Sequence, residues 1–226
     1  MTYFQRSFYC IMALAITLIF IHYSDLDIKF QSLFFNFETK LWLIDKNDQL
    51  IKFIFYRFPK YCIVTYGVIL IFWGAKLWLF KEREDLQKKI LFLVLSLILI
   101  PLIVAIFKHY SPIVCPVHIE EFGGWQKHIS PLDMFNLEVL FGNAGKCFPA
   151  GHASGGFSMI ALYFVMQSRR AKLIALIGSL SLGSIMGMYQ IAKGVHYLSD
   201  TITTLAIAYL VCIALEKLLL KEKAIQ

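Results

Sequence analysis

The hydrophobic positions of this chain form long apolar stretches that are separated by shorter polar segments. A bilayer core about 30 Å thick requires roughly 20 mainly apolar residues per helix. We predict membrane-spanning helices at about Ser7–Tyr23, Tyr61–Phe80, Ile90–Phe107, His152–Gln167, Leu173–Ile191 and Leu198–Leu220. The pattern therefore predicts an all-α fold, a polytopic six-helix transmembrane bundle. Since the sequence shows no internal repeat and no low-complexity tract, we predict a single membrane domain over residues 1–226.

Two polar stretches lie between the predicted spans. The segment 24–60 mixes charged and aromatic residues, as in "KFQSLFFNFETKLWLI", which is typical of an external amphipathic stretch at the membrane interface. A long external loop, "CPVHIEEFGGWQKHISPLDMFNL", runs from Cys115 to Leu137. Loops longer than about 12–15 residues are usually functional or disordered. We predict a flap near the lipid headgroups, and a flexible connector is the alternative.

The composition supports an integral membrane protein, because 58% of the residues are hydrophobic and 15% are aromatic. Ordinary soluble domains are roughly 45–50% apolar. No small-x-small cleavage pattern follows the first span, "FIHYSDLD", so we interpret this span as an uncleaved anchor.

The net charge of +7 is compatible with nucleic-acid binding, but cytoplasmic loops of membrane proteins also concentrate Lys and Arg. If the six spans alternate, twelve basic residues share one side: Arg6, Lys76, Lys81, Arg83, Lys88, Lys89, Arg169, Arg170, Lys172, Lys217, Lys221 and Lys223. Six further basic residues in segment 24–60 oppose this trend. We predict a multi-pass protein of a bacterial inner membrane, with both termini in the cytoplasm, the long loops in the periplasm and no nucleic-acid partner.

Three of the five cysteines, Cys10, Cys62 and Cys212, fall within apolar spans and are typical of small buried residues. Cys115 and Cys147 flank the long loop instead. With no CxxC and no zinc-finger spacing, an external disulfide is possible for this pair alone. The sequence does not decide whether it forms, because bridging depends on geometry.

Candidate chemistry lies at the ends of the later spans. On the predicted topology, Lys108, His152 and His196 reach the same membrane face, where ionisable groups are functional candidates. In "HYLSD", His196 and Asp200 are four residues apart, so they share one face if the last helix begins near His196. The carboxylate would then orient the imidazole and leave its other nitrogen free to attack or take a proton. The alternative is helix capping by Ser199 or Asp200, with a bystander histidine.

The stretch "CFPAGHASGGF" is typical of a turn that enters a helix at His152. A helix start exposes N–H groups and the positive end of the dipole, which suits an anion. His152 would then protonate a leaving group. Two alternatives need no function: Gly155 and Gly156 could serve close helix packing, and Lys108 could be an interfacial lysine.

In order along the chain, Lys108, the Gly151-His152 pair and His196-x3-Asp200 resemble the signature of the type 2 phosphatidic acid phosphatase superfamily. That signature reads K-x6-R-P, then P-S-G-H, then S-R-x5-H-x3-D. The resemblance implies a phosphatase that needs no metal or other cofactor and works through a phosphohistidine. It implies His196 as the nucleophile, Asp200 as its orienting partner, His152 as the general acid and Lys108 as a phosphate contact.

The sequence departs from the signature at three positions. Cys115 stands where the family has its first arginine, Ala150 replaces the serine, and Tyr189-Gln190 replaces Ser-Arg. Because Arg usually provides bidentate phosphate recognition, the departures predict a divergent member with a rebuilt phosphate clamp. Lys193, three residues before His196, is at helical spacing to supply charge. We predict these substrate-binding residues: Lys108, Lys193, Gly151, Ala150, Gln190 and Cys115; His109, Lys127, His128 and Lys146 are further loop candidates.

We therefore expect a phosphatase for a membrane lipid phosphate or pyrophosphate, acting on the periplasmic face. The family resemblance suggests undecaprenyl diphosphate, phosphatidylglycerol phosphate, phosphatidic acid or the phosphates of lipid A as substrates. Alternatives are a lipid phosphotransferase and a non-catalytic lipid-headgroup binder. A metal site built on His152 and His196 ranks last, because the sequence has neither HExxH nor a carboxylate-rich cluster. No obligate protein partner is evident.

Overall fold

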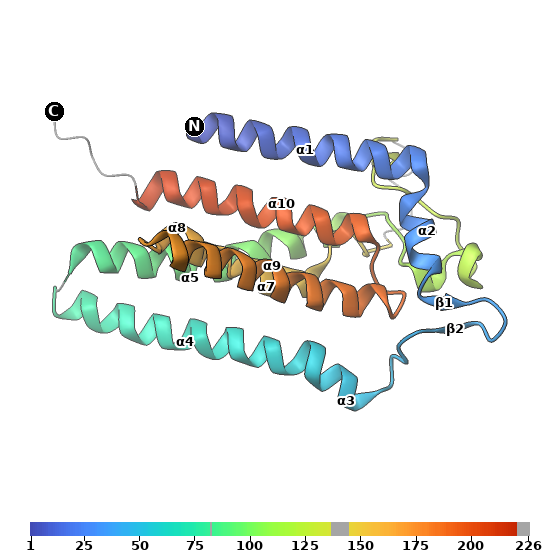
Figure 1. Cartoon of the computed structure of the whole chain (residues 1–226), viewed down its shortest axis with the longest axis horizontal. Coiled ribbons are helices and arrows are strands. Elements are labelled where there is room, and N and C mark those ends of the chain that lie inside the picture. Colours follow the sequence, from blue (N-terminus) through green and yellow to red (C-terminus); the bar gives the residue numbers. More distant parts are fainter. Residues whose placement is uncertain (82, 137–144, 221–226) are drawn as a thin grey trace.

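The computed structural model describes residues 1–81, 83–136 and 145–220. Five long helices run along the longest dimension of the molecule (Figure 1). Their bounds are α1 Tyr3–Ser24, α4 Phe58–Leu79, α5 Glu84–Tyr110, α9 Arg169–Ile191 and α10 Leu198–Leu215. Two short elements, α3 (Gln49–Lys52) and η1 (Phe53–Arg57), extend α4 at its start, and η5 (Glu216–Leu220) extends α10. Each of the five is long and apolar enough to cross a membrane, which confirms five of the predicted spans.

The predicted fourth span, His152–Gln167, is not one long helix. It consists of α7 (Gly151–Ser158) and α8 (Ala161–Val165), joined by a turn at Met159 and Ile160. The amides of these two residues bond three residues back, to the carbonyls of Gly156 and Phe157. Glycine has low helix propensity, and the Ser158 hydroxyl bonds the Gly155 carbonyl. The six-helix prediction was therefore wrong for this segment, which is apolar but not continuously helical.

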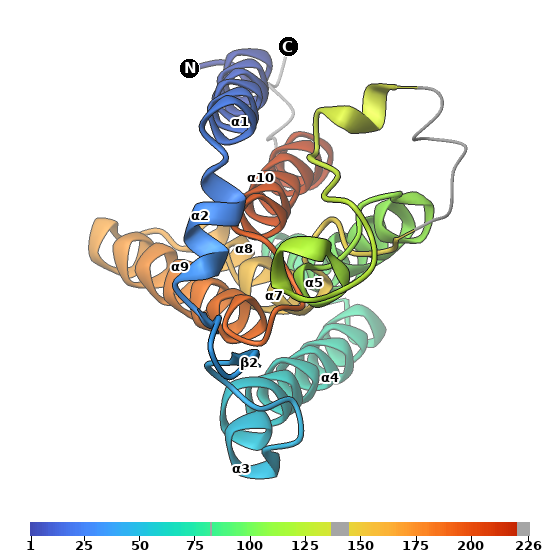
Figure 2. The same ribbon diagram turned by 90° about the vertical axis from the view of Figure 1, so that its right-hand side faces the viewer.

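Short α7 lies in the middle of the bundle, where it packs against α4, α5, α9 and α10 (Figure 2). Its contact with α9 is unusually close, because a Cβ on Gly156 would lie 2.6 Å from the Gly183 Cα. Small residues allow such approaches between membrane helices, so the predicted packing role of Gly156 is confirmed. By contrast, α1 packs against α10 at the periphery and is mostly unburied.

An N-terminal arm follows α1 and lies at one end of the bundle (Figure 1). It comprises α2 (Leu26–Ser32) and a hairpin of β1 (Phe35–Asn36) and β2 (Leu41–Trp42), which pair in antiparallel fashion. The loop after α5 joins it there and contains three 3-10 turns: η2 Pro116–His118, η3 Glu120–Phe122 and η4 Asp133–Phe135. Leu137, the last residue of the predicted loop, lies outside the described residues.

Aromatic rings join the arm to the loop. The Phe35 ring lies 4.9 Å from Trp42 and 5.3 Å from Phe122, between ring centroids. A second hydrophobic core, separate from that of the bundle, includes Phe35, Phe122 and Tyr197. The segment predicted to be an interfacial stretch is therefore, in part, a packed cap over residues 192–197, which we call the α9–α10 connection.

Candidate active site

His196 lies in the α9–α10 connection, and Asp200 lies in the first turn of α10. The His196 Nδ1 is 2.9 Å from the Asp200 Oδ2, and both side chains are completely buried. The same carboxylate oxygen accepts a bond from the Tyr197 backbone N–H at 3.0 Å. Asp200 thus caps the helix and also holds the imidazole, so the two interpretations of its role are compatible. Since α10 begins at Leu198, the two residues meet through this cap and not along one helical face.

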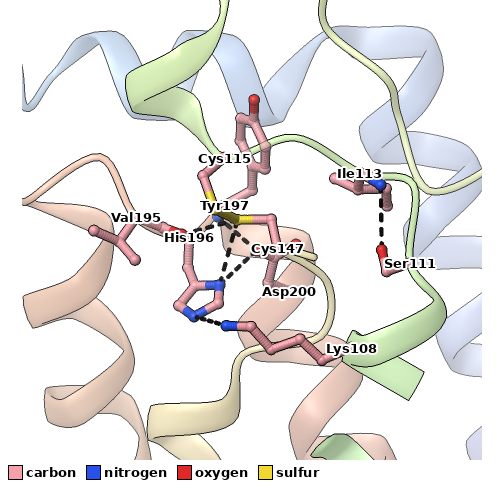
Figure 3. Close-up of a disulfide and its surroundings, with 9 residues drawn as sticks. All are labelled: Lys108, Ser111, Ile113, Cys115, Cys147, Val195, His196, Tyr197 and Asp200. Carbon is pink, nitrogen blue, oxygen red and sulfur yellow. Dashed lines mark hydrogen bonds and ion pairs between the residues drawn. A yellow bond between two sulfur atoms is a disulfide. The ribbon is translucent and has the colours of Figure 1, made fainter. Parts of the chain in front are cut away.

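The other nitrogen of His196 faces Lys108 in the last turn of α5. Lys108 Nζ and His196 Nε2 are 3.4 Å apart (Figure 3). Burial is the main factor that lowers the pKa of His196 well below its usual value, and the positive charge of Lys108 adds to this. The imidazole is therefore neutral near pH 7. With Nδ1–H donated to Asp200, the Nε2 lone pair is directed toward Lys108.

His152 lies in the first turn of α7, across from His196. The two ring centroids are 5.9 Å apart, and the Tyr56 ring centroid lies 4.7 Å from that of His152. Within the described part of the chain, the buried Nδ1 of His152 has no hydrogen-bond partner. The two histidines that the sequence separates by more than forty residues are thus brought together.

A cavity of about 380 Å³ opens beside His152. Its lining is apolar along α4, α5 and α9 and polar at the histidine end: Ile63, Val64, Leu97, Pro101, Met186, Tyr56, Lys60, Lys108, Gly151, His152, Ser154 and Gly155. His196 is not among its lining residues, and its Nε2 lies 3.4 Å from the Lys108 Nζ. A larger cavity of about 520 Å³ lies between α4 and α5 near Gly74 and Glu84, and its lining residues do not include the histidines.

The predicted substrate-binding residues are only partly gathered at this cavity. Lys108 and Gly151 line it. The Ala150 amide bonds the Asp200 carbonyl at 3.2 Å and is not free for an anion. Gln190 is buried at the end of α9, outside the lining. Of the further loop candidates, His109, Lys127 and Lys146 are exposed and do not line the cavity.

Lys193 reaches the site differently from the prediction. Because α9 ends at Ile191 and Gly194 adopts a positive φ of 72°, Lys193 lies in a turn and shares no helix with His196. Its ammonium lies 4.8 Å from the Tyr189 ring centroid. The positive charges of Lys60, Lys108 and Lys193 all act on His152, so the three lysines make this end of the site electropositive.

The structure joins Cys115 and Cys147 by a disulfide, the pairing that the sequence left open (Figure 3). The bridge links the loop after α5 to the turn before α7, and the Cys147 Sγ lies 3.8 Å from the His196 Nδ1. Cys115 therefore has no thiol proton to donate to a phosphate.

One cluster of metal-ligand residue types is found among the described residues, and it consists of Cys147, His196 and Asp200. Since its sulfur is bonded to Cys115, Cys147 supplies no thiolate for such a site.

The sequence-based prediction did not include four residues that lie at or near the site. Tyr56 and Lys60 line the cavity, and Asp27 and Gln31 bond the elements that flank His196. The signal for the first pair was available, because their four-residue spacing continues the helix that was predicted to begin only at Tyr61. Asp27 and Gln31 carry no comparable signal, since their partners lie 172 and 160 positions away.

Taken together, a bundle of apolar helices with a histidine–aspartate pair, a second histidine and lysines at one end defines a membrane-embedded hydrolase. Residues 89–223, which include every predicted catalytic residue, match the family model of the PAP2 superfamily. The chain belongs to this superfamily, and it is a lipid phosphatase of that kind.

A curated relative supports this assignment. The chain is 26% identical over 186 residues to a lipid A 4'-phosphatase of Francisella tularensis subsp. novicida (strain U112), and the match covers 81% of each protein. No solved structure matches the chain significantly.

Proposed function

We propose that this phosphatase hydrolyses a phosphate ester of lipid A or a chemically related membrane lipid, through a phosphohistidine at His196. The observation that carries the mechanism is the orientation of His196. Its Nδ1 is held by Asp200, and its Nε2 points toward Lys108, with the His152 ring nearby. An oriented neutral imidazole with one free lone pair is an activated nucleophile.

In the first step, the Nε2 lone pair forms a bond to phosphorus, and the bond from phosphorus to the lipid oxygen breaks. The negative charge of the bound phosphate favours the protonated form of His152, which donates this proton to the departing oxygen. The Asp200 carboxylate accepts the Nδ1–H bond throughout and stabilises the positive charge that develops on the imidazole.

In the second step, a water attacks the phosphorus of the phosphohistidine. His152 takes the proton of this water, so it regains the proton that it gave in the first step. The N–P bond breaks with its electron pair returning to Nε2. The products are inorganic phosphate and the free lipid alcohol, and both histidines return to their starting states.

Phosphate binding in this scheme displaces Lys108 from Nε2. In the structure the ammonium covers the nucleophile at 3.4 Å, and a phosphate oxygen is a stronger partner because it is charged. The first turn of α7 supplies further donors, because its N-cap, Ala150, has no side-chain oxygen to occupy them. Lys60 and Lys193 complete the replacement for the missing arginines.

The cavity supports a lipid substrate. Its apolar lining from α4 and α5 leads to Lys60, Lys108 and His152, so an acyl chain would lie along the helices while the phosphate meets the lysines. The lipid A class ranks first because the curated relative is named as a lipid A 4'-phosphatase. Undecaprenyl diphosphate, phosphatidylglycerol phosphate and phosphatidic acid remain comparison substrates.

The test is phosphate release by the purified protein in detergent, with EDTA present, from each of these four lipids. We expect release from lipid A to be fastest, with mass spectrometry identifying the phosphate that is lost. Label that passes to a second lipid, and not to inorganic phosphate, would instead show a phosphotransferase. A lack of turnover on all four lipids would contradict the proposal, and activity lost with EDTA and restored by zinc would contradict its metal-free mechanism.

We also propose that the site faces the periplasm of a bacterial inner membrane. The start of α1 and the turn between α4 and α5 lie at the end of the bundle opposite the arm (Figure 1), and basic residues concentrate at that end. In a variant lacking Cys10, Cys62 and Cys212, an impermeant thiol reagent should label a cysteine placed at Gly123 in intact cells. It should not label one placed at Gln87, and the opposite result would invert the topology.

A further inference from the structure

The α9–α10 connection is held from outside the bundle by α2. Asp27 accepts two hydrogen bonds from Ser199 in the first turn of α10. The backbone N–H donates to Oδ1 at 3.0 Å, and the hydroxyl donates to Oδ2. Asp27 is only 3% exposed, and Ser199 is fully buried. Because the first N–H groups of a helix lack partners within it, Asp27 caps α10 from a segment 172 positions away.

One helical turn further along α2, Gln31 binds the other end of the connection. Its Nε2 donates to the Ile191 carbonyl at 2.6 Å, and Ile191 is the last residue of α9. Gln31 is completely buried. Since Asp27 and Gln31 are four residues apart, they lie on one face of α2. This face bridges the end of α9 and the start of α10, between which His196 lies.

Two residues of β2 and the segment just after it add contacts to the same connection. The Ile44 amide donates to the Ala192 carbonyl at 3.3 Å. The Trp42 indole covers Gly194 so closely that an added Cβ would lie 2.4 Å from its ring. The arm lies before residue 89, outside the part of the chain that matches the family model. Nothing in that match therefore assigns a role to it.

We propose that Asp27 and Gln31 are positioning residues for the nucleophile, which fix the α9–α10 connection so that His196 Nε2 points at the phosphate; this rests on the proposed role of His196. Neither residue contacts the reacting atoms. They act through Ser199 and Ile191, and displacement of a reacting group by about 1 Å can cost on the order of a hundredfold in rate. Burial raises the pKa of Asp27 to about 6. The protein thus retains a carboxylate in surroundings that disfavour its charge.

The experiment compares Asp27→Ala, Asp27→Asn and Gln31→Met with Asp45→Asn, a matched control on an exposed aspartate between β2 and α3. We expect Asp27→Ala to lower kcat about tenfold to a hundredfold with KM changed less than about twofold. Asp27→Asn should recover most of this loss, because its amide can still accept from the Ser199 N–H. Gln31→Met should lower kcat severalfold, and the control should match the wild type.

Two measurements separate positioning from a merely structural role. Ser199→Ala removes only the hydroxyl bond and leaves the backbone N–H bond to Asp27, so it should lower kcat less than Asp27→Ala, and the two losses should not add in the double variant. Folding is checked by gel filtration and thermal midpoint, and kcat is given per folded protein. An Asp27→Ala variant with wild-type kcat would overturn the inference, as would equal losses in Asp27→Asn and Asp27→Ala. If His196→Ala itself kept activity, the proposed function would fail first, and the two failures are thereby distinguished.

Discussion

His196 and His152 lie close together but in opposite surroundings. His196 is fully buried, with Asp200, Lys108 and the Cys115–Cys147 bridge around its ring. His152 is half-buried at the wall of a cavity, where Tyr56 packs on its ring and its Nδ1 has no partner within the described residues. The surroundings of the proposed nucleophile are therefore organised before substrate arrives, whereas those of the proposed acid would be completed by the substrate. Changes on the two sides should have different kinetic consequences.

The largest effect should follow His196→Ala. Without the nucleophile no phosphohistidine can form, and we expect a loss of about 10⁴-fold or more in kcat, at or above the upper end for a positioned catalytic group. The measurement is phosphate release, together with an alkaline quench after labelled substrate to detect the phosphohistidine. A variant that still accumulates labelled protein would show that another residue takes the phosphate.

His152→Ala should cost roughly 10²–10⁴-fold with the natural lipid, and the size of the loss should depend on the leaving group. An aryl phosphate releases an oxygen that needs no proton, so the His152→Ala variant should recover much of its first-step rate with that substrate. His196→Ala should recover nothing. Equal losses on both substrates would contradict the assignment of His152 as the acid.

A second comparison, between the five long helices and the broken segment of α7 and α8, explains how much of the fold could be predicted from the sequence. Hydropathy sufficed for α1, α4, α5, α9 and α10, because each carries mainly apolar side chains over a length that can cross a membrane. It failed at α7 and α8, where Gly156 permits close contact with α9 and adjacent glycines do not favour one long helix. Average hydrophobicity does not register such a break.

The contact between His196 and Asp200 could be predicted because the two residues are only four positions apart. The roles of Asp27 and Lys60 could not be predicted, because these residues reach the site only through tertiary packing. Lys193 was predicted to face His196 along a helix, but the positive φ of Gly194 places a turn between the two residues. Local spacing thus predicted which candidate residues pair, whereas the residues around that pair depend on the fold.

Removal of a lysine charge near the cavity beside His152 should have a moderate effect on kcat/KM. Lys60 lines the cavity, so we expect Lys60→Met to lower kcat/KM about tenfold to a hundredfold, mainly through KM, at about 1.4 kcal/mol per tenfold. Lys193→Met should have a smaller effect, because Lys193 lies over Tyr189 and not at the cavity wall. Arginine at either position should retain more activity than methionine. Lys46→Met, at an exposed lysine of the arm, is the control, and a Lys60→Met variant equal to it would remove Lys60 from the clamp.

The smallest effect on rate should come from removal of the disulfide, although its effect on stability should be large. Cys115→Ala with Cys147→Ala releases a link across 32 positions, and links of this size restrict the unfolded chain by about 3–4 kcal/mol. We expect a lower thermal midpoint in detergent, with Cys62→Ala as the control at a free, exposed cysteine.

The rate of the same double variant tests what organises the nucleophile. Asp200 holds His196 directly and α2 holds the α9–α10 connection, so kcat should fall less than about tenfold, far less than for a misplaced catalytic group. A fall of about a hundredfold in folded protein would show that the hydrogen bonds alone do not orient His196. The disulfide, whose Cys115 stands where the family has an arginine, would then help to orient His196 in addition to stabilising the fold.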